Sequence, residues 1–286
     1  AGGSVETPKG RLDIQTLPAS AAGPDVREIF MGSEGRLGII SEVKVRVTKL
    51  AEKEDFYVIF FPSWLQAKDA ARELVQTKVQ LSMLRLSNAI ETVTQLALAG
   101  HPGQIALLEK YLRIRGAGEG KCMMTLGVTG NKAQCSAAHK LMKQTISPFK
   151  GVYTGNFMGK KWAEKRFMMP YLREALWQKG YAVDTLETAT DWDNVDHLLN
   201  LIEENLRHSL NDENEKVHVF THLSHFYGQG CSIYTTYVYR AGDRCEKTLA
   251  RWKKMKVSTS ELIVNNRGTI SHQHGVGKDH APYLPT

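Results

Sequence analysis

The chain has 286 residues, a formal net charge of +7 and a pI near 9.1, and it is 42% hydrophobic. This composition is that of a globular protein with a sizeable core, and it excludes wholesale disorder. The charge favours an anionic small molecule or a lipid-like partner, whereas the dispersed basic residues argue against a nucleic-acid-binding module.

The visible sequence carries no targeting or disulfide signal. Its four cysteines form no Cys-x-x-Cys pair, and reduced thiols in a cytoplasmic protein are the simplest interpretation. No apolar run reaches the length of about 18 residues that a transmembrane helix needs, so any membrane contact would be peripheral. The sequence leaves open whether two copies of the chain form a homodimer. The chain starts at Ala1 and stops at Thr286, just after its densest motif, and we expect it to be a piece of a longer protein.

The first 47 residues predict a loop-rich segment that ends in a strand. Residues 1–24 are rich in Gly, Ala, Pro and Ser, with a short strand at 12–14, and Asp25 fits the N-cap of a short helix. The glycine-rich stretch 32–38 then leads into an alternating strand at 41–47. Backbone amides in such a turn can meet a phosphate or carbonyl group. On spacing alone, a plain turn is the simpler interpretation.

Strands and helices alternate from residue 56 onwards. In the strand 81–87, alternation places Arg85 on the opposite face from Leu84 and Leu86. Two strand-helix-strand passages of similar length predict an α+β fold, with an antiparallel ferredoxin-like sheet backed by helices. The predicted strands are 56–62, 81–87 and 122–128, and the predicted helices are 63–75, 90–98 and 132–144.

The second half resumes this pattern after an irregular, basic and aromatic stretch at 153–172. Apolar residues at helical spacing predict a helix at about 192–210. Strands at 216–227 and 231–239 flank a Gly-Gln-Gly turn and predict a hairpin. A last helix at 244–256 and an apolar segment at 262–264 lead into the final motif.

Residues 269–280 gather the densest set of reactive side chains, including His272, His274 and Lys278. Such a cluster can exchange protons, hold an anion or ligate a metal. The spacing fits no helix-borne zinc motif, and we predict no metal. The predicted hairpin adds His218, His222, Tyr227 and Tyr234, which on one sheet face could form a proton-relay set near this turn. For any one of these histidines alone, an ordinary hydrogen-bonded role is the simpler interpretation.

One motif resembles a known superfamily. Residues 32–42 read Gly-Ser-Glu-Gly-Arg-Leu-Gly-Ile-Ile-Ser-Glu, similar to the Gly-Ser-Glu-Gly-Thr-Leu-Gly-Val-Ile-Thr-Glu signature of vanillyl-alcohol oxidase / p-cresol methylhydroxylase flavoproteins. Arg36 replaces the usual threonine. In those proteins the motif closes the FAD-binding domain and packs on the cofactor. The resemblance therefore implies FAD, bound through Gly32, Ser33, Glu34, Gly35, Leu37, Gly38, Ile39 and Ile40.

Later motifs resemble the alkyldihydroxyacetonephosphate synthase branch of that superfamily. Residues 271–278 read Ser-His-Gln-His-Gly-Val-Gly-Lys, against Ser-His-His-His-Gly-Val-Gly-Lys in the family. Segments 84–88, 170–173, 186–193 and 230–234 also resemble family segments, in the same order. The resemblance implies the end of an FAD-binding domain at 1–48 and a substrate-binding cap domain at 49–286, with an active-site turn at 271–280.

That family exchanges the acyl chain of an acyl-dihydroxyacetone phosphate for an alkyl chain through a flavin N5 adduct, without net redox change. By motif, Tyr234 would move protons and Arg173 would lie at the acyl-leaving side. The implied catalytic residues are Tyr234, His272, His274 and Arg173, and the implied supporting residues are Arg85, Lys278 and Gln273.

Gln273 stands where the family has a histidine, and glutamine does not titrate near neutrality. An FAD-dependent D-2-hydroxyacid dehydrogenase, which oxidises a substrate such as D-lactate by hydride transfer, is therefore an alternative within the same superfamily. A second alternative is a non-catalytic substrate-binding fragment. Because most FAD contacts of the family lie outside this chain, we expect the chain by itself to purify colourless and inactive.

Overall fold

The computed structural model describes residues 2–168 and 171–284. The chain folds into two compact units, one formed by Ala1–Leu50 with Gln273–Leu284 and the other by residues 51–272. Pro170, the first residue of one family-like segment, lies outside the described residues. No helix among the described residues is long and apolar enough to cross a membrane.

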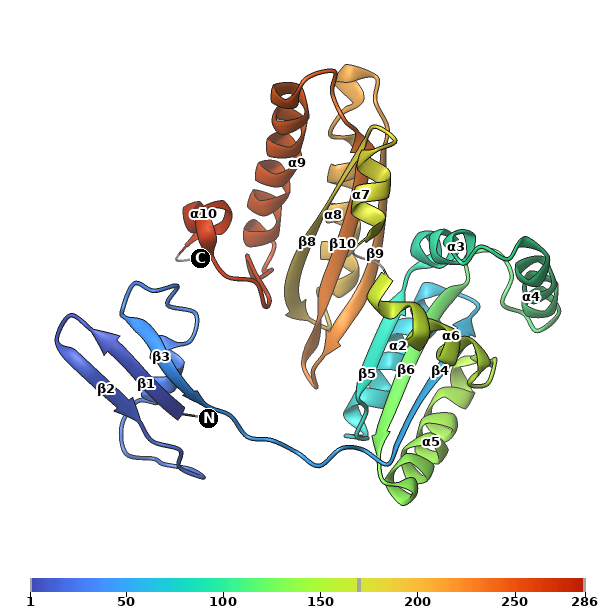
Figure 1. Cartoon of the computed structure of the whole chain (residues 1–286). Helices are drawn as coiled ribbons and strands as arrows, with labels where there is room; N and C mark the ends of the chain where they lie inside the picture. The colour runs from blue at the N-terminus through green and yellow to red at the C-terminus, as the bar shows by residue number, and fades with distance from the viewer. Residues whose placement is uncertain (1, 169–170, 285–286) are drawn as a thin grey trace. The chain divides into compact units, whose positions relative to one another are not determined.

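The smaller unit contains a three-stranded antiparallel sheet in the order β2-β1-β3 (Figure 1). Asp25 caps its first helix as predicted, because the Asp25 side chain accepts a hydrogen bond from the Arg27 N–H. The chain's last segment completes the unit. Its elements are β1 (Gly2–Thr7), β2 (Gly10–Ile14), α1 (Val26–Phe30), β3 (Ile39–Lys44), α10 (Gly277–His280) and the 3-10 turn η4 (Ala281–Tyr283).

Strand β1 is a correction to the predicted loop at 1–24. Its small residues resemble a loop in composition, yet it pairs with β2 on one side and β3 on the other. A Cβ added at Gly3 would lie 2.0 Å from the carbonyl oxygen of Glu42. The glycine that suggested a loop is therefore what allows the neighbouring strand to approach.

The larger unit is built on one seven-stranded antiparallel sheet in the order β7-β4-β6-β5-β9-β10-β8 (Figure 1). Two ferredoxin-like halves meet where β5 pairs with β9, which confirms the predicted α+β fold. The strands are β4 (Lys53–Phe61), β5 (Met83–Ser87), β6 (Cys122–Gly130), β7 (Val152–Tyr153), β8 (Tyr181–Asp191), β9 (Val217–Phe226) and β10 (Gly230–Arg240).

The main core lies between one face of this sheet and four long helices. Alternate strand residues such as Ile59, Phe61 and Tyr237 are fully buried there with apolar side chains of the helices. Helix α2 begins after the predicted cap Ser63, whose side chain accepts a hydrogen bond from the Gln66 N–H. The four helices are α2 (Trp64–Gln76), α5 (Lys132–Ile146), α8 (Val195–His208) and α9 (Cys245–Asn265).

A second, smaller core covers part of the opposite face. Val58 and Phe60 alternate with the residues above and pack with Leu96 and Leu112 from two helices. The helices of this side are shorter: α3 (Ala89–Leu98), α4 (Pro102–Ile114), α6 (Phe157–Lys165) and α7 (Tyr171–Trp177). Short 3-10 turns lie at η1 (Ser147–Phe149), η2 (Arg166–Met168) and η3 (Asn211–Glu213).

Several elements differ from the sequence prediction, including α6, which forms in the stretch 153–172 that is predicted to be irregular, and α7, which follows it. The prediction contains neither α4 nor β8, and it ends the last helix at Lys256, whereas α9 continues to Asn265. The stretch Val257-Ser258-Thr259-Ser260 has low helix propensity. Thr259 and Ser260 are nevertheless buried, and the Asn205 side chain donates a hydrogen bond to Thr259 Oγ1. Tertiary contacts thus override local propensity.

We predict that Gly159→Ala will destabilise the larger unit. A Cβ at this position of α6 would lie 2.0 Å from the carbonyl oxygen of Phe56 in β4, so the helix must shift. The expected loss is about 1–3 kcal/mol in the free energy of unfolding. The matched control is Gly103→Ala in α4, where an added Cβ meets nothing within 4 Å. Urea denaturation measures both, and equal stability of the two variants would contradict this packing.

Candidate functional site

A row of polar side chains crosses four strands of the larger sheet. Ser87 lies opposite His222, His222 opposite Tyr234, and Tyr234 opposite Glu187. Directly opposed residues of neighbouring strands point to the same face of a sheet. Ile233, Thr235 and Tyr237 alternate with Tyr234 and are buried on the side of the long helices, so the row occupies the other face.

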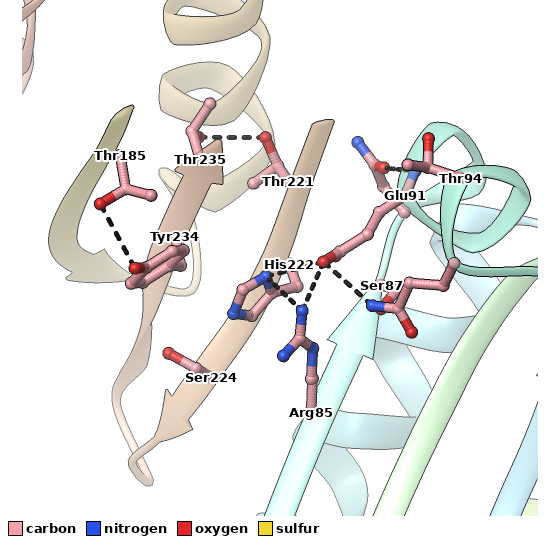
Figure 2. A network of polar contacts seen from close by, with 12 residues as sticks. Arg85, Ser87, Glu91, Thr94, Thr185, Thr221, His222, Ser224, Tyr234 and Thr235 are labelled. Carbon is pink, nitrogen blue, oxygen red and sulfur yellow. Dashed lines mark hydrogen bonds and ion pairs between the residues drawn. The ribbon is translucent and has the colours of Figure 1, made fainter. Parts of the chain in front are cut away.

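Tyr234 and His222 form the centre of this row (Figure 2). Their rings stack, with centroids 4.8 Å apart and planes tilted by 23°. The Tyr234 hydroxyl donates a hydrogen bond to Thr185 Oγ1 at 3.3 Å. His222 is 7% exposed while Tyr234 is half-buried. The tyrosine is therefore held from two sides and still reaches solvent or a ligand.

Glu91 of α3 approaches this pair from the first half of the sheet (Figure 2). Its Oε1 lies 2.5 Å from Arg85 Nη2 and 3.1 Å from His222 Nδ1, and its side chain is 1% exposed. Burial opposes ionisation of Glu91, but His222 and Arg85 attract its negative charge and lower its pKa to about 2. Burial lowers the pKa of His222 below its usual value, although Glu91 opposes this effect. The geometry thus fixes an ionised carboxylate between the Arg85 guanidinium and the His222 ring.

A second buried network anchors α3, and with it Glu91. Asn88 caps the helix, because its Oδ1 accepts a hydrogen bond from the Glu91 N–H, and its Nδ2 donates to Glu203 Oε1 of α8 at 2.8 Å. Thr221 also donates to Glu203 Oε1, at 2.7 Å, and lies 3.0 Å from Thr235. The helix start is therefore tied through the sheet to the helix layer behind it.

A β-bulge places a third histidine beside the row. The register between β9 and β10 shifts between Cys231 and Ile233, so one extra residue of β9 is accommodated. A bulge re-aims the side chains around it. As a result His225, three positions after His222, lies with its Nδ1 3.3 Å from Glu187 Oε1.

His272 reaches the same carboxylate from the end of the larger unit. Its Nδ1 lies 3.3 Å from Glu187 Oε1, and its Nε2 lies 2.7 Å from the Tyr227 hydroxyl. The His272 and His225 rings are 4.7 Å apart. The Glu187 side chain is 0% exposed, so the carboxylate that both imidazoles approach is buried.

An apolar cavity of about 560 Å³ adjoins the other end of the row. Its floor is formed by residues such as Val58, Met123 and Thr125 of the sheet, and its walls by residues of α3, α4 and α6. Arg85 lines it, so a residue that pairs with Glu91 also borders the cavity.

The smaller unit brings two other motifs together. The backbone N–H of Gly277 donates hydrogen bonds to both carboxylate oxygens of Glu34, at 3.1 Å each. A Cβ at Gly275 would lie 2.6 Å from Glu34 Oε1, so a larger residue there would make the Glu34 carboxylate shift. The glycine-rich turn at 32–40 and the turn at 273–278 therefore contact each other.

The residues predicted from sequence fall into three groups. Tyr234, Arg85 and His272 lie along one face of the larger sheet. Arg173 lies exposed on α7. Gln273, His274 and Lys278 belong to the smaller unit, together with Gly32, Ser33, Glu34, Gly35, Leu37, Gly38, Ile39 and Ile40.

The site also contains four residues that the sequence prediction leaves out of the catalytic and supporting set: Glu91, Glu187, His222 and His225. His222 carries a sequence signal, its place in the predicted hairpin. Glu91 is three residues after Asn88, a spacing typical of a capping box, which predicts a purely local role. The Asn88 half of that motif forms, but the Glu91 side chain turns to Arg85 and His222 instead.

We predict that Glu91→Gln will lower the free energy of unfolding by about 3 kcal/mol at neutral pH, because it leaves Arg85 without its buried counter-charge. The unfolded chain binds a proton at Glu91 near the ordinary value of 4.5, whereas the folded pKa is about 2. The stabilisation by Glu91 is therefore complete above pH 4.5 and is lost as the pH falls towards 2.

Urea denaturation at a series of pH values should show that the stability difference between wild type and Glu91→Gln narrows over this acidic range. The exposed Glu204→Gln serves as the control and should change stability by less than about 0.5 kcal/mol. A difference that is independent of pH would contradict the assignment of an ionised Glu91.

Comparison with known proteins shows which proteins this chain resembles. Alkyldihydroxyacetonephosphate synthase of Dictyostelium discoideum is 27% identical over 285 residues, which are 97% of this chain and 46% of that protein. The chain thus spans about half the length of this relative. Mitochondrial D-lactate dehydrogenase [cytochrome] of Arabidopsis thaliana is 33% identical over only 72 residues, 25% of this chain and 13% of that protein.

A solved structure of alkyldihydroxyacetonephosphate synthase shares the fold, with a TM-score of 0.79 at 23% identity over 94% of this chain and 49% of that one. Residues 50–286 match the family described as FAD linked oxidases, C-terminal domain. This match covers most of the chain and confirms the flavoprotein resemblance. The chain therefore belongs to the FAD-linked oxidases, whose C-terminal domain it contains, and FAD is its cofactor.

Proposed function

We propose that this chain is the substrate-binding part of an FAD-dependent enzyme that exchanges an acyl for an alkyl chain on a dihydroxyacetone phosphate-type substrate. The observation that carries the proposal is the apolar cavity that ends at Arg85, next to His222 and Tyr234. A long hydrocarbon tail and an anionic head are the two chemical features that such a site would recognise.

The cavity is suited to the hydrocarbon tail. Its volume lies within the range of about 300–1,000 Å³ that is usual for ligand pockets. Leu96, Leu108 and Met158 contribute apolar wall, and each methylene group buried there contributes roughly 0.8 kcal/mol to binding. A small hydroxy acid such as D-lactate has no tail to fill this space, which favours the synthase-like reaction over the dehydrogenase alternative.

The polar row is suited to the reacting end of the substrate. Arg85 binds the phosphate or ester oxygens, since guanidinium donors pair well with such acceptors. Tyr234 exchanges a proton with the oxygen of the departing or arriving chain. His222 supports the tyrosine ring by stacking, and Glu91 keeps both Arg85 and His222 in place. Arg173 is assigned to the acyl-leaving side by motif alone.

The smaller unit has residues that fit FAD. Leu37, Ile39 and Ile40 expose 45%, 72% and 51% of their surface, which offers apolar contact to an aromatic ring system. Gly32 and Gly35 have positive φ and open space where a Cβ would stand, so backbone can approach the cofactor there. The turn at 32–40 would hold FAD, which supplies the electron-accepting chemistry when bound.

The contact between Glu34 and Gly277 supports a shared role for the two turns of the smaller unit. It sets the segment that carries Gln273, His274 and Lys278 beside the proposed FAD-binding turn. Lys278 and His274 would then supply positive charge and hydrogen bonds to an anionic group held at these two turns, and Gln273 would contribute hydrogen bonds without titrating.

We predict that Ala99→Trp will weaken binding of a fluorescent long-chain fatty acid by about tenfold or more, because the indole fills part of the cavity that Ala99 lines. Ala97→Trp is the matched control, since Ala97 lies exposed in the last turn of α3, two residues before the cap residue Ala99, and does not line the cavity. Fluorescence titration of the 286-residue chain measures both variants. Equal binding by the two variants, or displacement of the probe by butyrate as readily as by palmitate, would contradict a tail-binding cavity.

We predict that Tyr234→Phe will lower kcat for acyl-alkyl exchange in the FAD-containing enzyme by about 100-fold or more, with KM changed little, because the hydroxyl that moves the proton is lost. Tyr57→Phe is the control, since the Tyr57 hydroxyl contacts Asp55 on the opposite side of the sheet. The assay follows incorporation of a radiolabelled fatty alcohol.

The flavin spectrum separates the two candidate reactions. Acyl-alkyl exchange should leave FAD oxidised at the end of each turnover. Full exchange activity in Tyr234→Phe would overturn the role of Tyr234, and bleaching of the flavin absorbance by D-lactate would establish the dehydrogenase instead.

A further inference from the structure

We propose that Glu187, His225 and His272 form a binding site for one divalent transition-metal ion, with Zn²⁺ as the natural probe. This inference does not depend on the proposed function. It differs from the expectation from sequence, in which the spacing of the histidines near the C-terminus indicates no metal.

The three side chains offer a ligand set of the right size. One oxygen of Glu187 lies 3.3 Å from Nδ1 of His225 and 3.3 Å from Nδ1 of His272, and the three ligand atoms lie within 4.8 Å of one another. A tetrahedral zinc with bonds of about 2.0–2.1 Å holds its ligand atoms about 3.3–3.4 Å apart. Two of the three separations already match that value.

The orientation of His272 points to a ligand rather than to a direct hydrogen bond. Its side chain is 9% exposed, and its Nδ1 is buried without a hydrogen-bond partner among the residues that the structure describes. Nδ1 is close to the Glu187 carboxylate, yet the geometry is not that of an N–H donating to it. A buried polar atom left in this way is costly unless something else binds it.

The outer contacts are those that a metal-bound histidine requires. His272 Nε2 lies 2.7 Å from the Tyr227 hydroxyl. With the ring proton on Nε2 donated to Tyr227, the lone pair of Nδ1 is free to bind a cation. Ser224 donates a hydrogen bond to Glu187 Oε1 at 3.3 Å, which orients the carboxylate.

His225 completes the set from the bulge of β9. Its Nδ1 also lies 3.2 Å from Ser224 Oγ and 3.5 Å from Ser232 Oγ. Its side chain is 42% exposed, whereas Glu187 is at 0% and His272 at 9%. The site therefore opens to solvent on the side of His225, which gives the ion a route in and leaves a fourth position for water or an oxygen ligand.

Two imidazoles and one carboxylate are ligands that suit Zn²⁺ and its neighbours in the first transition series. Mg²⁺ and Ca²⁺ prefer all-oxygen ligands, so they should bind far more weakly. Glu187 lies opposite Tyr234 in the β8–β10 register, so the ion would bind at the β8 end of the polar row.

The test is isothermal titration calorimetry of the chelator-treated 286-residue chain with ZnCl₂ alone. We expect one equivalent of Zn²⁺, a rise in Tm on binding, and no detectable binding of Mg²⁺ under the same conditions. Glu187→Gln and His225→Ala should each weaken binding by at least about 100-fold, and Tyr227→Phe by about tenfold, because it removes an outer contact.

Two control variants test whether Zn²⁺ binds at other residues of the chain. Cys245→Ser removes the exposed thiol and His208→Gln removes a second imidazole outside the site, and both should bind Zn²⁺ as the wild type does. Failure of the wild type to bind, unchanged binding by Glu187→Gln and His225→Ala, or loss of binding in Cys245→Ser would each overturn the site. Should Glu187→Gln not fold, His225→Ala and Tyr227→Phe test the same site through its other residues. None of these measurements uses FAD or substrate, so a negative result leaves the proposed enzyme function untouched.

Discussion

The buried carboxylate of Glu91 is the constraint on which the arrangement of the polar row depends. It lies in α3, which follows β5 within the first half of the chain's larger unit, yet it binds His222 of the second half and Arg85 of the first. A carboxylate that is 1% exposed can remain ionised only because a guanidinium lies beside it. The ion pair with Glu91 thereby holds Arg85 in place at the cavity. The contact between Glu91 and His222 likewise sets how the imidazole stacks on the Tyr234 ring.

The junction of β5 with β9 makes this contact achievable. Each ferredoxin-like half alone would end in an unpaired strand edge, and pairing the two halves removes both edges at once. The pairing also aligns Ser87 with His222. As a result, the apolar cavity of the first half and the tyrosine of the second lie on the same face, with Arg85 between them.

The β-bulge in β9 determines the geometry at the Glu187 end of the polar row. Without the bulge in β9, strand alternation would send His225 to the face opposite His222. With it, His225 and His272 both approach Glu187. Two chemically different ends therefore flank Tyr234: an anion-binding arginine on one side, and two imidazoles with a carboxylate on the other.

Local sequence determined the regular elements and the family. Alternation in 81–87 placed Arg85 away from Leu84 and Leu86, and the caps at Asp25 and Ser63 began helices where expected. The motifs at 32–42 and 271–278 indicated the flavoprotein family that the match over residues 50–286 confirms. These features depend on neighbours in the chain or on backbone conformations that few residues allow. Tertiary structure alone decided that Glu91 would leave its capping position, that the bulge would turn His225, and that α9 would run on through Thr259. Each of these three features depends on partners far away in sequence or on the register of paired strands. A local sequence pattern encodes neither the distant partners nor the register.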